Sequence, residues 1–501
     1  MQFVNNLNNL ILDDQYFLNV PVEDGSTATA TGNIGLVGTF SRGPLNTPML
    51  VTSYQDLVKK FGDVESNLTG AVAARGIFQQ GNANVYVVRI AAASLTDGAA
   101  TLTIKDDQGA SILKLDAKTP GTWGDDILVT VAPGTKTGTY KLFVQVGTES
   151  ELWDNLLLEE PTVPVAGGLL IESVLGEEGR SSLIKAEVLA ATTGKLVNGT
   201  FALSQGDNGA VAVASDYIGT NTNGKKTGLQ ALDNSPINLV ICAEQGDEAV
   251  NEALIENAES ITANGGLPRM ALLTFPRGTT VSMLQTLTQN LDSDRAISTY
   301  PWVNIAEVDG STRVVSPLGY VAGVLAQLQP HLSMGNKSIS GILGADPELI
   351  LGPAELTQLV QSRVNPVGVQ TPSGQLGIRS SLTLSQDQGN QQIYVRRMQD
   401  YINQLVSSVG GLFVDQPITD DLMRQVYHSV DNALRPLKSP INPAEQMIVD
   451  YKVVCDASNN PAQSIAQNRL ICDYAVKLLN VNRFMIFRTQ IGSGVVVTKQ
   501  N

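Results

Sequence analysis

The sequence predicts a multidomain protein of the α/β and α+β classes, with a parallel-sheet α/β core domain, an inserted β-rich domain, and an α+β C-terminal domain with extended terminal β arms. Three observations predict it. Apolar runs alternate with helical patterns over residues 32–95 and 201–345, which is typical of strand–helix–strand units around a parallel sheet. Residues 96–200 hold short alternating runs between turn residues, and residues 346–490 hold two amphipathic helices. A chain of 501 residues also exceeds what one hydrophobic core usually organises.

The core domain is expected to begin with two strands and two helices. Residues 35–40 and 48–52 are apolar runs joined by a turn at Gly43, and Ser53 precedes the helical pattern of residues 54–61 as its N-cap. The next expected elements are helix 68–80 and the buried strand 84–90. After the insertion the alternation resumes, with strands at 237–242, 270–274 and 298–303 and helices at 247–264, 281–291 and 319–328.

The inserted and C-terminal domains have different patterns. Within the β-rich insertion the expected strands are 101–104, 112–115, 127–131 and 140–146. The C-terminal domain is expected to contain strand 378–384, helices 393–409 and 419–434, and strands 447–455, 469–478 and 483–490.

Both ends of the chain predict strands that lack a partner. The N-terminal arm and hinge, residues 1–31, carry Phe3, Val4 and Leu7, and the C-terminal β arm, residues 491–501, carries the β-forming run Val495, Val496, Val497 and Thr498. A lone terminal strand leaves backbone donors and acceptors unpaired, so it either closes its own sheet or pairs with a neighbouring molecule. We therefore expect these residues to act as inter-subunit strand arms in an assembly.

Composition excludes several functional classes. The net charge of −15 disfavours direct contact with nucleic acid or an anionic membrane, and no apolar run approaches the roughly 20 residues of a membrane-spanning helix. The N-terminus lacks the pattern of a signal peptide, so we expect folding in the cytoplasm. The three cysteines, Cys242, Cys455 and Cys472, are too few for a disulfide framework and are expected to be reduced and buried.

Residues that could support catalysis are scarce. With only two histidines, far apart in sequence, the chain offers almost no material for a catalytic triad or a zinc site. Gly219 to Thr227 comes within one residue of a phosphate-binding P-loop, but Lys226 occupies the position of the hydroxyl that would bind magnesium. We expect a solvated loop there, no cofactor, no metal site and no enzymatic activity.

Basic residues gather in the C-terminal helices of this acidic chain. Arg396 and Arg397 open one helix and Arg424 lies in the next. Two interpretations remain open. These residues either form a solvated helix face or dock an acidic partner, including an acidic surface on another copy of the chain.

Taken in order, the motifs of the chain resemble those of contractile tail sheath proteins of myovirus-type phages and related contractile injection systems. The resemblance covers nearly the whole sequence. It is carried by these segments: Gly35-Leu-Val-Gly38, residues 42–52, residues 73–89, the Pro-Gly-Thr-Trp-Gly run at 120–124, Tyr300-Pro-Trp302, residues 364–369, and Tyr394-Val-Arg-Arg397 with the helices and strands after it.

The resemblance implies a structural subunit that assembles as stacked six-fold rings around an inner tail tube, with the C-terminal domain facing the tube. It implies that the terminal arms add strands to sheets of adjacent subunits and that the extended sheath is metastable. On a signal from the baseplate, the sheath would contract and drive the tube through the host envelope.

The implied partners are other copies of the chain, the inner tail tube protein, and the baseplate and tail terminator proteins. The implied location is the virion tail, assembled in the bacterial cytoplasm, and Arg396, Arg397 and Arg424 are candidates for the tube-facing surface. Two alternatives stay open: the sheath of a bacteriocin or another contractile injection system, and, more distantly, a nucleotide-binding motor that uses residues 219–227.

Overall fold

The computed structural model describes residues 2–4, 16–18, 31–95, 97–160, 165–189, 195–349, 351–369, 374–440, 442 and 445–485. It divides into two compact units. One unit is Gly32–Arg396, and the other, here called the C-terminal unit, is Arg397–Asn501 together with Met1–Thr31.

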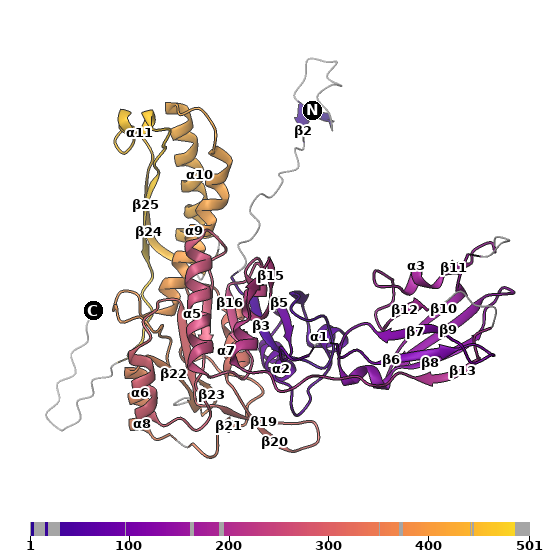
Figure 1. Cartoon of the computed structure of the whole chain (residues 1–501). Helices are drawn as coiled ribbons and strands as arrows, with labels where there is room; N and C mark the ends of the chain where they lie inside the picture. Colours follow the sequence, from indigo (N-terminus) through magenta and orange to yellow (C-terminus); the bar gives the residue numbers. More distant parts are fainter. Residues whose placement is uncertain are drawn as a thin grey trace. The chain divides into compact units, whose positions relative to one another are not determined.

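An eight-stranded sheet organises the larger unit (Figure 1). The six inner strands run parallel, and the two edge strands, β4 and β23, run antiparallel to their neighbours. In spatial order the strands are β23 (Leu376–Ile378), β22 (Val364–Val369), β18 (Ala296–Tyr300), β17 (Met270–Leu273), β16 (Leu239–Cys242), β3 (Ile34–Thr39), β5 (Val85–Ile90) and β4 (Met49–Val51).

Both faces of this sheet are covered, which explains why its strands are almost continuously apolar. Leu36 packs into one core with helices α1, α2 and α7, whereas its neighbour Val37 packs into a second core with α5. The helices of the unit are α1 (Tyr54–Phe61), α2 (Gly70–Gln80), α4 (Ala214–Ile218), α5 (Glu248–Ala263), α6 (Val281–Gln289), α7 (Leu318–Gln327) and α8 (Pro353–Gln361), with the 3₁₀ helix η3 (Gly228–Leu232).

The chain between β5 and α4 builds a separate core from two sheets. One sheet has the order β11 (Leu169–Leu170), β10 (Glu149–Leu157), β9 (Tyr140–Val146), β8 (Leu128–Pro133) and β13 (Gly199–Ala202). The other has the order β12 (Ile184–Val188), β7 (Ser111–Ala117) and β6 (Thr101–Lys105). The short helices η2 (Thr122–Asp126) and α3 (Ile171–Leu175) lie between these strands.

Buried Arg89 joins this insertion to the main sheet. Its guanidinium, at the end of β5, donates to the carbonyl oxygen of Gly43 at 2.8 Å and to that of Pro120 at 2.7 Å. Burial lowers the pKa of Arg89 to about 10. Because Pro120 lies in the insertion and Gly43 follows β3, one side chain fixes three segments that are distant in sequence.

Two smaller sheets complete the larger unit. One has the order β20 (Thr312–Val315), β19 (Val303–Ala306) and β21 (Gly344–Ala345). The other is the short hairpin β14 (Asn221–Thr222) and β15 (Lys225–Lys226).

The C-terminal unit packs an antiparallel pair of strands, here called the ribbon, against helices. Its elements are α9 (Ile393–Gly410), which begins in the larger unit, η4 (Gly411–Phe413), α10 (Asp420–Lys438), ribbon strand β24 (Ile448–Val454), α11 (Ala462–Ala466) and ribbon strand β25 (Asp473–Leu478). Met398, Leu434 and Val453 lie in its apolar core. Near the N-terminus, β1 (Gln2–Val4) pairs in parallel with β2 (Tyr16–Leu18).

Three expected strands differ from the structure. The strand expected at 298–303 ends at Tyr300, and β19 begins at Val303 in a different sheet. The strand expected at 378–384 was wrong beyond Ile378, because the side chain of Asn365 accepts from the backbone nitrogen of Leu382 and donates to its carbonyl oxygen in place of a neighbouring strand. In the strand expected at 483–490, residues 483–485 form no strand. Residues 486–490 lie outside the described residues.

Close packing of α2 against α7 generates a stability prediction. A Cβ added at Gly319 would lie 2.2 Å from the carbonyl oxygen of Ala73, whereas one added at Gly410 in α9 would meet no atom within 4 Å. Alanine normally favours a helix over glycine by about 1 kcal/mol, so Gly410→Ala is expected to leave stability unchanged or raise it. Gly319→Ala should instead lower the free energy of unfolding by about 1–3 kcal/mol through overpacking, measured by urea denaturation. Equal effects of the two substitutions would contradict this packing.

Candidate assembly surfaces

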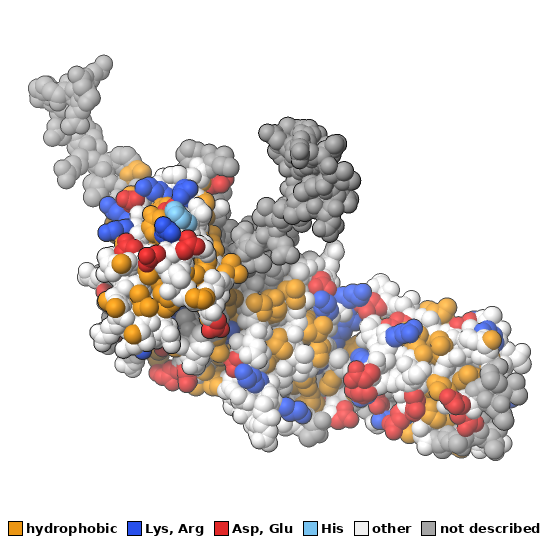
Figure 2. Space-filling model, turned by 90° about the horizontal axis from the view of Figure 1, so that it is seen from above, with side chains coloured by type: hydrophobic (Ala, Val, Ile, Leu, Met, Phe, Trp, Pro, Cys, Tyr) orange, Lys and Arg blue, Asp and Glu red, His pale blue; other side chains and the backbone are white. Residues whose placement is uncertain are grey.

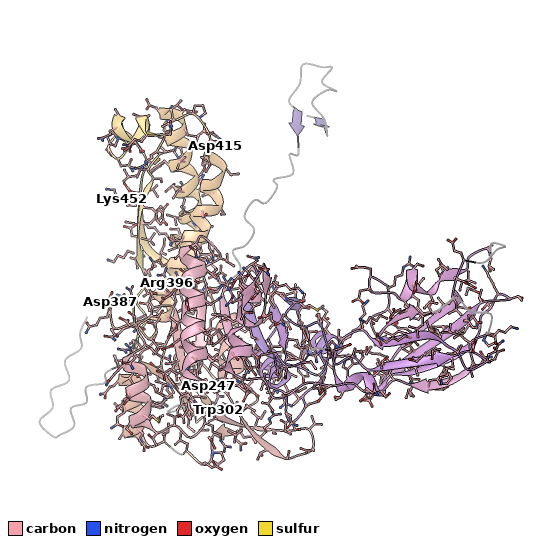
Figure 3. The ribbon with its side chains drawn as sticks, viewed as in Figure 1. Asp247, Trp302, Asp387, Arg396, Asp415 and Lys452 are labelled. Atoms are coloured by element: carbon pink, nitrogen blue, oxygen red, sulfur yellow. The ribbon has the colours of Figure 1, made fainter. Side chains whose placement is uncertain are left out.

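The ribbon offers backbone groups that the described chain does not pair. Its strands face one another in the register Asp450↔Lys477 to Val454↔Asp473, and the sheet contains no third strand among the residues described. One face, including Val453, packs onto the helices, and the other exposes Lys452 and Lys477 (Figure 3 shows Lys452). Two-stranded ribbons are marginal alone, and open strand edges are templates for further strands.

The predicted strand arms are placed only in part. Phe3 and Val4 belong to β1, which pairs with Phe17 and Leu18 of β2 within the same chain. Leu7 and the run Val495, Val496, Val497 and Thr498 lie outside the described residues. Their pairing with a neighbouring subunit therefore stays a prediction.

The three arginines predicted to face a tube lie in different environments. Arg396, near the start of α9 (Figure 3), has a side chain only 12% exposed and forms an ion pair of 3.1 Å with Asp294. Arg397 is buried, donates to the carbonyl oxygen of Thr31 at 3.3 Å, and has its pKa lowered to about 10 by burial. Arg424 in α10 is 71% exposed and pairs with Asp421. Sequence reasoning missed this difference because it could not see which face of α9 is buried.

Two other basic side chains near the end of α10 also form ion pairs with carboxylates. Arg435 pairs with Asp431, and Lys438 pairs with Asp450 across to β24. Asp431 additionally accepts a hydrogen bond from Tyr451 at 2.7 Å, and these donors hold the pKa of its carboxyl below the usual value. The end of the unit where α10 and α11 lie, viewed from above in Figure 2, accordingly shows basic, acidic and hydrophobic side chains mixed together.

An apolar surface lies where α9 connects to α10. Leu412 is 73% exposed and Val414 is 69% exposed, on a segment that follows the helix end at Gly410. In the sequence, the apolar run Gly-Leu-Phe-Val at 411–414 between two amphipathic helices is the signal that could have predicted this surface. Exposed side chains of this size are consistent with a protein that has further contacts to make.

The near-P-loop segment folds as a hairpin. Gly219 ends α4, residues 221–226 form the β14–β15 hairpin, and positive φ angles at Asn223 and Gly224 make the tight turn that suits a two-residue hairpin loop. Lys226 forms an ion pair of 3.0 Å with Asp233. A P-loop needs a strand, a glycine-rich loop and then a helix N-terminus, and this order is not present here.

A cleft of about 470 Å³ lies at the carboxyl ends of β3 and β5, where open α/β sheets commonly bind ligands. Its hydroxyl groups satisfy one another: Thr69 Oγ1 lies 3.1 Å from Thr39 Oγ1 and 3.0 Å from the Tyr217 hydroxyl. No described group of three or more His, Cys, Asp or Glu could hold a metal ion, and no described helix has the length and apolarity to cross a membrane.

The carboxyl of Glu244 has a pKa near neutrality. Glu244 follows β16 with a positive φ, and both of its carboxylate oxygens accept from the backbone nitrogen of Ser316, just before α7, at 3.0 and 3.1 Å. Burial of the carboxyl raises its pKa from 4.5 to about 7, while the Ser316 N–H and the charge of Arg313 act in the opposite direction.

The chain is similar in sequence to tail sheath proteins. Residues 31–90, which span β3, β4, α1, α2 and β5, match the family model described as tail sheath protein Gp18 domain III N-terminal region. The chain is 23% identical over 498 residues to the tail sheath protein of Burkholderia phage BcepMu, covering 93% of each sequence. The predicted resemblance to contractile tail sheath proteins is confirmed.

Solved sheath structures share the fold along most of their length. The sheath tail protein Lin1278 of Listeria innocua aligns with a TM-score of 0.61 at 14% identity, covering 90% of this chain and 96% of that one. The helical sheath of the anti-feeding prophage in its contracted state aligns with a TM-score of 0.53 at 13% identity, covering 97% and 99%. This chain thus shares the mixed α/β multidomain fold of these sheath proteins.

Reversing the charges of Arg396 and Arg424 separately should distinguish the half-buried arginine from the exposed one. Arg396→Glu places an anion beside Asp294 and should lower the free energy of unfolding by about 2 kcal/mol or more. Arg424→Glu, on an exposed pair, should change it by less than about 1 kcal/mol. Chemical denaturation of both variants checks this, and a destabilised Arg424→Glu would contradict the assigned environments.

Glu244 should impose a specific pH dependence. Because its pKa is higher in the folded state, the folded chain binds the proton more tightly, and the stability contributed is present below pH 4.5 and lost as the pH rises to about 7. Relative to Glu244→Gln, which cannot ionise, the wild type should lose about 1–3 kcal/mol across this window. Parallel pH profiles of unfolding free energy for the two proteins would contradict the assignment.

Proposed function

We propose that this chain is the structural subunit of a contractile tail sheath, assembled as stacked hexameric rings around an inner tube. The observation that carries the proposal is the end-to-end likeness to a phage tail sheath protein, at 93% coverage of both sequences. The fold shared with phage and injection-system sheaths supports it. Contraction from a metastable extended state would drive the tube through the host envelope.

The ribbon is proposed as the joint between subunits. Strands from the terminal arms of adjacent copies, carrying Phe3, Val4 and Leu7 at one end and Val495, Val496, Val497 and Thr498 at the other, would extend its two open edges. Backbone hydrogen bonds give affinity without a deep pocket, and they can persist while the linkers that lead to each arm change direction. This property suits an assembly whose subunits reorient without separating.

Contraction in this proposal needs no nucleotide. Each ring would gain new contacts as it rearranges and would pass the change to the next ring, so the energy is stored at assembly. The hairpin at residues 221–226 and the pairing of Lys226 with Asp233 favour this reading over a nucleotide-driven motor.

The tube-facing surface is proposed in a revised form. Since Arg397 is buried and Arg396 is half-buried in an ion pair with Asp294, Arg424 is the one of the three whose side chain is largely exposed to an acidic partner. We place it, with the exposed Leu412 and Val414, on the surface of the C-terminal unit that would meet the inner tube. Baseplate and tail terminator proteins would contact the ends of the assembly.

The sequence is similar to a phage tail sheath protein, and the fold is shared with the sheath of the anti-feeding prophage. The sheath could therefore belong to a virion, assembled in the bacterial cytoplasm, or to a bacteriocin or other contractile injection system. Electron microscopy of particles from the producing cell separates the two, since only a virion carries a DNA-filled head.

Assembly by the purified chain tests the proposed joint. In negative-stain electron microscopy the full chain should form hollow cylinders, and a chain truncated before Gly492 should form only small particles. Val496→Pro and Val497→Pro should each be compared with Val496→Thr and Val497→Thr. Proline removes a backbone donor of the strand ladder and clashes in a strand, whereas threonine keeps the donor and is compatible with a strand.

Cylinders from the truncated chain, or from both proline variants, would contradict a joint made by the terminal strand. If the full chain stays dispersed, the same series is repeated with the inner tube protein as template. Failure of the full chain to coat that tube would refute the sheath proposal.

A further inference from the structure

The two cysteines of the C-terminal unit lie opposite one another at one end of the ribbon. The register pairs Val453 with Tyr474 and Val454 with Asp473, so the next position outward on each strand is Cys455 and Cys472. Opposed residues of an antiparallel pair point to the same face, and here that face is the apolar core beneath the helices. Both thiols are free in this structure.

Backbone spacing at this position matches what a disulfide requires. Opposed residues in antiparallel strands have Cα atoms about 4.5 or 5.5 Å apart, depending on their hydrogen bonding. Disulfides span Cα separations of about 4.4–6.8 Å. Either type of antiparallel pair therefore lies within the Cα range of a disulfide.

Two asparagines hold the strands together at this end. The Asn459 side-chain nitrogen donates to the carbonyl oxygens of Val454 at 2.9 Å and of Ile471 at 3.2 Å, which bridges the residues just before each cysteine. The Asn460 side chain accepts from the Ile471 backbone nitrogen at 2.6 Å and donates to the Ile471 carbonyl oxygen at 2.9 Å. The approach of the two cysteines is thus built into the turn, although they are far apart in sequence.

The two thiols also interact with one another. Burial raises the pKa of Cys455 to about 12, and the neighbouring Cys472 contributes to that increase. Burial raises the pKa of Cys472 as well, but a hydrogen bond with Cys455 acts to lower it. Cys472 is the more exposed of the two, so it is the thiol that a small molecule reaches first.

We propose that Cys455 and Cys472 form a redox-controlled cross-link site that closes the turn between β24 and β25. The oxidant is a small-molecule disulfide of the glutathione type. The Cys472 thiolate attacks one of its sulfurs, forms a mixed disulfide and releases one small thiol after protonation. Cys455, as thiolate, then attacks the Cys472 sulfur, forms the Cys455–Cys472 bond and releases the second small thiol.

The reaction is balanced as two protein thiols plus one small disulfide giving one protein disulfide plus two small thiols. The unfolded chain would be restricted by the closed ring from residue 455 to residue 472, which includes α11. The ribbon would be stabilised at the end remote from Ile448 and Leu478. This inference concerns the chain alone and does not depend on the proposed function.

Peptide mapping of the purified full chain tests the inference. The reduced protein is incubated with oxidised glutathione, free thiols are alkylated, and a non-reducing tryptic digest is analysed by mass spectrometry. Cleavage after Lys452, Arg469 and Lys477 puts each cysteine on its own peptide, so a bond between peptides 453–469 and 470–477 is expected. The linked species should disappear on reduction.

Variants and thermal melting complete the test. Cys455→Ser and Cys472→Ser should each abolish the linked peptide, and Cys242→Ser, in the distant sheet, should retain it. Oxidation of the wild type should leave its melting temperature unchanged or raised, and reduction should reverse any increase.

Several outcomes would overturn the inference: alkylated cysteines only, a stable glutathione adduct, a link to Cys242, a disulfide-bonded dimer, or a lowered melting temperature on oxidation. Because the wild-type map already decides, poor folding of a variant does not affect the conclusion.

Discussion

In the proposed assembly, the open edges of the β24–β25 ribbon are the constraint on which the joint between subunits depends. The ribbon buries one face on α9 and α10, and the described chain supplies no third strand. Water can satisfy the unpaired backbone groups in a monomer, but an added strand satisfies them with fixed geometry. A molecule with a two-stranded sheet that is open at its edges, and with β-forming runs near both ends of its sequence, is therefore suited to bind further copies of itself.

The larger unit is built differently, as a closely packed body. Its parallel strands are covered on both faces, the glycines of α7 allow close contact with α2, and Arg89 ties the inserted sheets to β5. In the proposed contraction, we therefore expect the larger unit to move as a whole, and the changes of backbone direction to occur in the segments that lead to the terminal arms.

Strong local patterns allowed much of this fold to be predicted from sequence. The apolar runs of β3 and β5 and the amphipathic period of α9 and α10 were placed to within a few residues, since burial dictates those patterns. Strand β10 was missed because its acidic and amide residues conceal the alternation. The strand expected at 378–384 ends at Ile378, and beyond it the side chain of Asn365 bonds to the backbone of Leu382. The ion pair of Arg396 with Asp294 and the proximity of Cys455 to Cys472 depend on tertiary contacts that no local pattern encodes.

Hydrogen–deuterium exchange on the ribbon tests the central claim most directly. Amides of residues 448–454 and 473–478 are compared in the dispersed chain and in assembled cylinders, with β16 and β17 as internal references that are already protected. If arms of adjacent subunits extend the ribbon, its exchange should slow strongly on assembly while that of the references stays constant. Cylinders whose ribbon amides exchange as fast as in the dispersed chain would contradict a joint made by strand addition.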